Sequence, residues 1–121
     1  MPKTNIHLGA QIRIVFEGCL LEPLVDLRSL HRRLKRTARL AGLTVVRSCA
    51  HRYHPQGATI VLILKESHLV LHTWPEYGAV IVELFSCALP VPAGRIAASL
   101  KAHLGASRQR LSTTPIRIRG K

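Results

Sequence analysis

Residues 58–64 read Ala-Thr-Ile-Val-Leu-Ile-Leu, residues 68–73 read His-Leu-Val-Leu-His-Thr, and residues 79–86 read Ala-Val-Ile-Val-Glu-Leu-Phe-Ser. Each run is short and rich in apolar and β-branched residues, and polar or turn-forming residues separate the runs, which is typical of β-strands. Strands that follow one another directly along a chain favour an antiparallel sheet. The three runs therefore predict three strands of such a sheet.

The residues on both sides of these three runs extend the pattern. Further strands are predicted at three places, from alternation or from β-branched residues: residues 11–17, 43–48 and 113–119. Apolar residues recur at three- or four-residue spacing in two stretches, which predicts helices over residues 23–41 and 92–104. This order of elements indicates an α+β fold: a two-layer sandwich of an antiparallel sheet with two helices on one face.

Helices on one face leave the other face of the sheet uncovered. The run at 58–64 is apolar at almost every position, as in a strand that is covered on both faces. A second copy of the chain is the simplest cover for the remaining face. We therefore expect a homodimer.

Length and composition indicate one globular domain over residues 1–121, because 47% of the residues are hydrophobic. No apolar run reaches the roughly 18 residues that a membrane-spanning helix needs. The first residues lack the apolar block of a secretion signal, so a cytoplasmic protein without membrane attachment is expected. The three cysteines, Cys19, Cys49 and Cys87, lack the spacing of a metal site, and no metal is expected.

The net charge is +12, and the basic residues gather within residues 28–39 and 95–121. Such an excess is compatible with nucleic acid or another acidic partner. No aromatic residues are interleaved with these charges, which counts against a surface that stacks single-stranded bases. The favoured interpretation is a solvated helix face and tail, with nucleic acid not expected as a partner.

The segment 65–78 concentrates reactive side chains, since it holds a hydroxyl, two imidazoles and two carboxylates beside apolar strands. Residue types alone leave three interpretations open. The first is a polar strand end with ordinary hydrogen bonds. The second is nucleophilic catalysis by a serine or cysteine with a histidine base, although the Gly-x-Ser-x-Gly elbow is absent. The third is a metal site from His68 and His72, which is disfavoured because these residues would lie about 13 Å apart in a strand.

A longer string of residues narrows these alternatives. Residues 66–78 read Glu-Ser-His-Leu-Val-Leu-His-Thr-Trp-Pro-Glu-Tyr-Gly, and this string resembles the processing and active-site segment of the bacterial S-adenosylmethionine decarboxylases. The resemblance continues through His-Arg-Tyr-His-Pro-Gln-Gly at 51–57 and Glu-Leu-Phe-Ser-Cys at 83–87. In looser form it covers about residues 12 to 104, and a string of this length is specific.

The resemblance implies a pyruvoyl-dependent proenzyme that cuts its own backbone between Glu66 and Ser67. The products would be a β chain of residues 1–66 and an α chain of residues 67–121. Ser67 would become the pyruvoyl cofactor at the start of the α chain. This group acts as an electron sink for decarboxylation, as bound pyridoxal does.

The resemblance also assigns roles to three further residues. His72 is implied as the base or proton shuttle in processing, which suits an imidazole because it titrates near neutrality. Thr59 is implied to assist processing, at a position where the family usually has serine. Cys87 is implied as the acid that protonates the product.

Two residues bear on the substrate. Tyr53 stands where the resemblance implies an adenine-stacking aromatic residue, and Glu76 where it implies a ribose-binding carboxylate. Both favour S-adenosylmethionine, used for spermidine and other polyamines. Glu76 could instead pair with the distal charge of ornithine or arginine, and Ala79, where the family often has an aromatic residue, keeps that alternative open. An inactive relative that binds nucleic acid through its basic face is the alternative from a different class.

Overall fold

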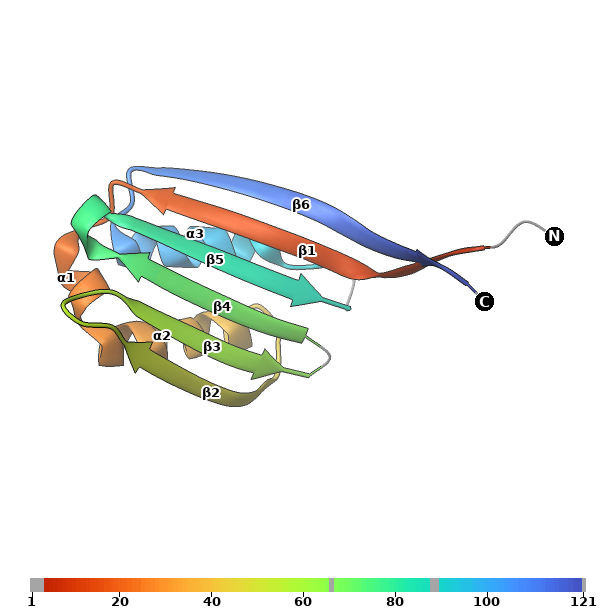
Figure 1. Cartoon of the computed structure of the whole chain (residues 1–121), viewed down its shortest axis with the longest axis horizontal. Coiled ribbons are helices and arrows are strands. Elements are labelled where there is room, and N and C mark those ends of the chain that lie inside the picture. Colours follow the sequence, from red (N-terminus) through yellow and green to blue (C-terminus); the bar gives the residue numbers. More distant parts are fainter. Residues whose placement is uncertain (1–3, 66, 88–89, 121) are drawn as a thin grey trace.

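A computed structural model describes residues 4–65, 67–87 and 90–120. They form one antiparallel sheet with helices on one of its faces (Figure 1). The strands are β1 (Asn5–Glu17), β2 (Val45–Arg52), β3 (Ala58–Leu64), β4 (Ser67–Trp74), β5 (Ala79–Ser86) and β6 (Arg108–Arg119). The helices are α1 (Leu21–Val25), α2 (Leu27–Leu40) and α3 (Ala93–Leu104), with the short 3-10 helix η1 (Pro75–Tyr77) between β4 and β5. The predicted α+β two-layer sandwich is confirmed.

The six strands lie in the order β2-β3-β4-β5-β1-β6. The runs predicted as strands at 58–64, 68–73 and 79–86 are β3, β4 and β5, which pair consecutively and antiparallel. β1 then pairs with both β5 and β6, so the two ends of the chain lie in adjacent strands. Figure 1 shows that the β1–β6 pair extends as a ribbon beyond the other strands.

Alternation along the strands separates a buried face from an open one. In β3, Ile60 and Leu62 are fully buried, whereas Ile63 is 48% exposed. The buried face packs against α2 and α3 in one core, to which the helices contribute Leu30, Leu34, Ile96 and Leu100. Burial of each such side chain contributes roughly 1.5–3 kcal/mol. The predicted helices are thus confirmed as one layer on one side of the sheet.

The helix predicted over residues 23–41 is interrupted, and this is a correction. α1 ends at Val25, and α2 begins after Asp26. The Asp26 carboxylate accepts a hydrogen bond from the backbone N–H of Ser29, at 3.1 Å, and so caps the second helix. Apolar spacing continues across the break, which is why periodicity predicted a single helix.

Three strand boundaries also differ from the prediction. β1 begins at Asn5 and β6 at Arg108, earlier than the predicted residues 11 and 113, and β2 covers Val45–Arg52 in place of residues 43–48. Asn5 pairs with Arg119 at one end of the β1–β6 ladder, and Glu17 pairs with Arg108 at the other. Hydrogen bonds to a partner strand extend these strands beyond the residues whose local sequence predicts a strand.

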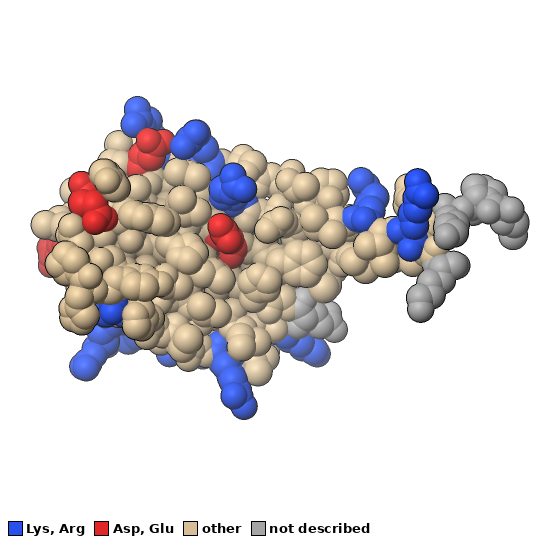
Figure 2. All heavy atoms as spheres, viewed as in Figure 1, with Lys and Arg blue, Asp and Glu red and all other residues tan. Residues whose placement is uncertain are grey.

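The open face of the sheet is mainly uncharged (Figure 2). Its central strands present Val61, Val70 and Ile81, which are only half-buried because no helix covers them. This is the uncovered apolar face that the run at 58–64 predicted. Within the described ranges, no helix is long and apolar enough to cross a membrane.

Candidate active site

One group of the predicted site residues meets where β3 begins and β4 ends. The antiparallel register places Thr59 directly opposite His72. The backbone N–H of Ala58 donates to the Thr73 hydroxyl at 2.9 Å, which ties the two strands together at this end. A pocket of about 330 Å³ opens here, lined by Tyr53, Gln56, Gly57, Ala58, Thr59, His72, Thr73, Trp74 and Glu76. We call this group the histidine end of the sheet.

A chain of hydrogen bonds orients the imidazole at the histidine end. The Tyr53 hydroxyl lies 3.0 Å from the Thr59 hydroxyl, which in turn lies 3.0 Å from Nδ1 of His72. The bond to Nδ1 fixes the ring plane and leaves Nε2 as the nitrogen for proton transfer to another molecule. Trp74 lies beside the imidazole, with ring centroids 5.9 Å apart. A tyrosine, a threonine and a histidine thus act as one connected unit.

Glu76 enters the same pocket from η1. Its carboxylate accepts a hydrogen bond from the side chain of Gln56, at 3.2 Å. Gln56 belongs to the loop between β2 and β3, where the sequence predicted only a turn. The structure therefore adds Gln56 and Trp74 to the lining, because residues distant in sequence meet at one strand end.

Ser67 and Cys87 lie at the opposite end of the sheet, which we call the serine end. Ser67 is the first residue of β4 and pairs with Ser86, the last residue of β5. Cys87 follows directly and is exposed. Glu66, the residue before the predicted cleavage point, lies outside the described residues.

Gly9 of β1 makes the backbone of the serine end possible. A Cβ at this position would lie 2.2 Å from the carbonyl oxygen of Ser86 and 3.1 Å from Cα of Cys87. Only glycine allows this approach, so any larger residue would displace the chain that carries the thiol. The sequence contained no sign of this role, because the contact depends on the pairing of β1 with β5.

The histidine end and the serine end do not meet within one chain. His72 comes five residues after Ser67 in the same strand, which corresponds to about 16 Å. An odd spacing also puts the two side chains on opposite faces of β4. Cys87, which directly follows β5, and His72 of the neighbouring strand β4 likewise lie at opposite ends of the sheet. The structure thus brings Tyr53, Thr59, His72 and Glu76 together, and separately Ser67 and Cys87.

Comparison with known proteins adds to this geometry. The model of the S-adenosylmethionine decarboxylase family matches residues 11–115. The chain belongs to this family. The match includes every described strand of the sheet at least in part, and it covers the histidine end and the serine end together.

Individual relatives of the family agree. An S-adenosylmethionine decarboxylase proenzyme of Thermotoga maritima is 37% identical over 101 residues, which cover 84% of this chain and 78% of the relative. A proenzyme of the same name from Pseudomonas aeruginosa is 32% identical over 88% of this chain and 66% of its own length. The crystal structure of the Aquifex aeolicus adenosylmethionine decarboxylase superposes with a TM-score of 0.79 and 27% identity, covering 89% of each chain. A Trypanosoma brucei structure, with a TM-score of 0.62 and 15% identity, shares the fold.

Proposed function

We propose that this chain is the proenzyme of a pyruvoyl-dependent S-adenosylmethionine decarboxylase in polyamine biosynthesis. One observation carries the proposal. The candidate catalytic residues are divided between the serine end and the histidine end of one sheet, and no helix covers the open face of that sheet. The serine end supplies a hydroxyl at the start of a strand and a thiol next to it. The histidine end supplies an oriented imidazole and a pocket with an aromatic and an acidic side.

Self-processing follows from the chemistry of Ser67. Its hydroxyl attacks the carbonyl carbon of the preceding residue, and the acyl group moves from nitrogen to oxygen. A base then removes the Cα proton of Ser67, and the Cβ–O bond breaks with release of residues 1–66 as a carboxylate. The dehydroalanine that remains hydrolyses to a pyruvoyl group with loss of ammonia.

The residues at the serine end fit this product. Ser67 is half-buried at the rim of the sheet, where its new terminus stays next to the backbone of Ser86. The exposed thiol of Cys87 comes directly after the end of the adjacent strand β5. A pyruvoyl group at this position would supply the electron sink for loss of the substrate carboxylate.

A homodimer supplies the base that a single chain cannot supply at Ser67. His72 lies about 16 Å away along β4, too far for proton transfer, which requires hydrogen-bond reach. A second copy packed against the open face, with its strands running the opposite way, places the partner's His72 over the serine end, where the partner's imidazole reaches the first residue of β4 around the rim of the sheet. Face-to-face sheets lie about 10 Å apart. The two-fold axis then lies between the sheets and across the strands, and the dimer has two composite sites.

Replacing Cys87 with alanine should separate processing from turnover. The variant should still cut itself, because the thiol takes no part in the acyl shift. Decarboxylation should fall roughly 10²- to 10⁴-fold, the usual contribution of a positioned proton donor. Gel analysis and carbon dioxide release measure the two steps on the same sample. Cys49→Ala, which removes an exposed thiol from the edge strand β2, is the matched control. Wild-type turnover by Cys87→Ala would remove this residue from the mechanism.

The pocket at the histidine end supports S-adenosylmethionine as the substrate. Tyr53 and Trp74 offer aromatic surface for adenine and for a sulfonium, which an aromatic face attracts by roughly 0.5–2 kcal/mol. The two oxygens of Glu76 can accept both ribose hydroxyls. Ornithine and arginine would use Glu76 for their distal charge but would leave the aromatic surface without a role.

Carbon dioxide release from separate substrates tests this assignment. Processed enzyme should decarboxylate S-adenosylmethionine and leave ornithine, arginine and lysine unchanged. Glu76→Gln should raise KM about 10- to 100-fold, since a hydrogen bond to a charged group contributes about 1.5–3 kcal/mol. Glu22→Gln, on α1 outside this pocket, should leave KM unchanged. Turnover of an amino acid alone would contradict the substrate and leave the pyruvoyl chemistry in place.

A further inference from the structure

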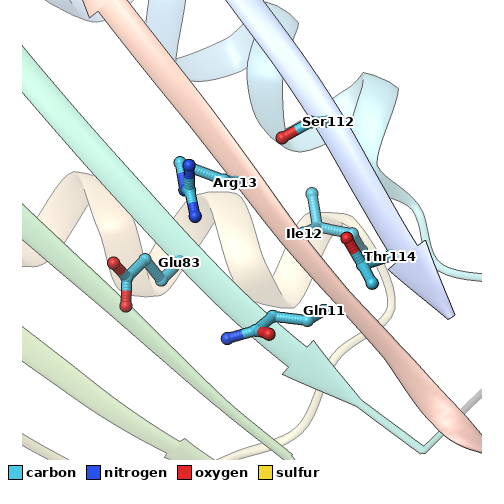
Figure 3. Close-up of a pocket in the computed structure, with 6 residues that line it drawn as sticks. All are labelled: Gln11, Ile12, Arg13, Glu83, Ser112 and Thr114. Carbon is cyan, nitrogen blue, oxygen red and sulfur yellow. The ribbon is translucent and has the colours of Figure 1, made fainter. Parts of the chain in front are cut away.

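Two opposite charges lie in the middle of the open face. Arg13 of β1 and Glu83 of β5 are direct partners in the antiparallel register, and both are exposed. Figure 3 shows their side chains projecting from neighbouring strands on the same side of the sheet, next to Gln11. They line a small depression of about 50 Å³ together with residues of β6. The neighbouring positions along the two strands are the half-buried Val15 and Ile81.

Neither Arg13 nor Glu83 takes part in an ion pair recorded among the described residues. The two ion pairs recorded among the described residues both use Glu17, which contacts Arg108 and Arg110 at 3.5 Å. Covering the open face would remove Arg13 and Glu83 from water. A charge that is buried without a partner is costly, so whatever covers this face must supply compensating charges at this point.

The symmetry of the composite site brings these residues together. If Ser67 of each copy meets the partner's His72, the two-fold axis must cross β4 midway between the two residues, beside Val70. Val70 is in register with Glu83, and Glu83 with Arg13, so these residues form one row across the sheet. The axis follows this row. Arg13 of one copy therefore faces the partner's Arg13, and Glu83 faces the partner's Glu83, so that each Arg13 lies diagonally across the interface from the partner's Glu83.

We propose that Arg13 and Glu83 of two copies form a four-residue charge cluster on the dimer axis, and that this cluster sets the register of the two sheets. The inference rests on the proposed dimer. The cluster is electrically neutral, and each guanidinium has its own Glu83 beside it on the neighbouring strand and the partner's Glu83 diagonally across the interface. If one sheet shifts along the strand direction relative to the other, Arg13 and Glu83 of one copy move away from those of the partner. The charges of both copies then stay buried without the compensating charges across the interface. The same shift would move Ser67 away from the partner's His72, so the cluster positions the site without touching substrate.

Charge reversal in separate chains tests the cluster. Arg13→Glu places four carboxylates on the axis, and Glu83→Arg places four guanidinium groups there. Each variant alone should dimerise about 100-fold or more weakly than wild type, because like charges at an interface cost several kcal/mol. Each should also process slowly at low concentration. Both should keep the circular dichroism of wild type, since both positions are exposed in the single chain.

A mixture of the Arg13→Glu and Glu83→Arg chains tests the charge cluster most directly. A mixed dimer again holds two acidic and two basic groups on the axis, so dimerisation and processing should recover to near wild type. Sedimentation or native mass spectrometry measures the dimers, and gels measure the cut. Arg95→Glu on the outer side of α3 and Glu22→Arg on α1 are matched controls that should dimerise normally.

The outcomes separate this inference from the proposed function. Wild-type dimerisation by each reversed variant would overturn the cluster and leave the shared site standing. Recovery in the double variant Arg13→Glu/Glu83→Arg, without recovery in the mixture, would show a pair within one chain and would overturn the cluster as well. A wild-type protein that cuts itself as a monomer would overturn the shared site and the cluster together.

Discussion

Replacing Ser67 with alanine should leave the chain in one piece and without decarboxylase activity. In the proposed mechanism, the Ser67 hydroxyl starts the acyl shift, and the same residue becomes the pyruvoyl group. One substitution therefore removes both the cut and the cofactor, so the expected loss of turnover is complete. Denaturing gels should show a single band where wild type gives two.

A matched serine provides the control for that variant. Ser48 is half-buried on the edge strand β2, away from both ends of the candidate site, and Ser48→Ala should process and turn over like wild type. Folding of Ser67→Ala should be intact, because a half-buried serine at a strand end contributes little to the core. Two fragments from Ser67→Ala would contradict the assigned cleavage point.

Co-production of two inactive chains should restore cleavage. Ser67→Ala keeps the imidazole but lacks the hydroxyl, and His72→Ala keeps the hydroxyl but lacks the imidazole. Neither should cut itself alone. In a mixed dimer, one composite site holds the intact Ser67 of the His72→Ala chain and the intact His72 of the Ser67→Ala chain. The other composite site lacks both groups.

This arrangement predicts which chain is cut and how often. Random pairing makes half of the dimers mixed, so about one chain in four should be cleaved. All cleaved chains should carry the His72→Ala substitution, which intact mass distinguishes. Thr59 should behave like His72, since its hydroxyl bonds to Nδ1 of the same imidazole. No cleavage in the mixture, with dimers present, would place the base elsewhere.

Local pattern predicted the layers of this fold well. The runs at 58–64, 68–73 and 79–86 carry their own strand signal, because apolar and β-branched side chains suit a pleated, packed surface. Helix spacing in residues 23–41 and 92–104 likewise predicted which elements cover the sheet. The uncovered face was already visible in the apolar run at 58–64, since both of its sides avoid charge.

The remaining features of the structure depend mostly on contacts between residues or side-chain interactions that the local hydrophobic pattern does not reveal. The ribbon ends of β1 and β6 are strands because they pair with each other, and Gly9 matters because β1 passes close to Ser86. The break before α2 depends on the side chain of Asp26, which apolar periodicity ignores. Gln56 reaches Glu76 only because the turn before β3 folds beside η1.

The resemblance to the family predicted the residues of the candidate site, and the structure shows that these residues form two groups at opposite ends of the sheet. Tyr53, Thr59, His72 and Glu76 form one group, and Ser67 and Cys87 another. The five-residue interval between Ser67 and His72 was present in the sequence. Its consequence became clear only when both residues were found in one straight strand, where the interval is a distance of about 16 Å.

The intact mass of the purified wild-type chain tests the central claim most directly. Two fragments should appear, residues 1–66 with a free carboxyl terminus and residues 67–121 with a pyruvoyl group. The second fragment should be lighter than a serine-initiated fragment by the mass of ammonia, and it should react with a hydrazide. A single full-length mass, or a second fragment that begins with a free serine amine, would contradict the account.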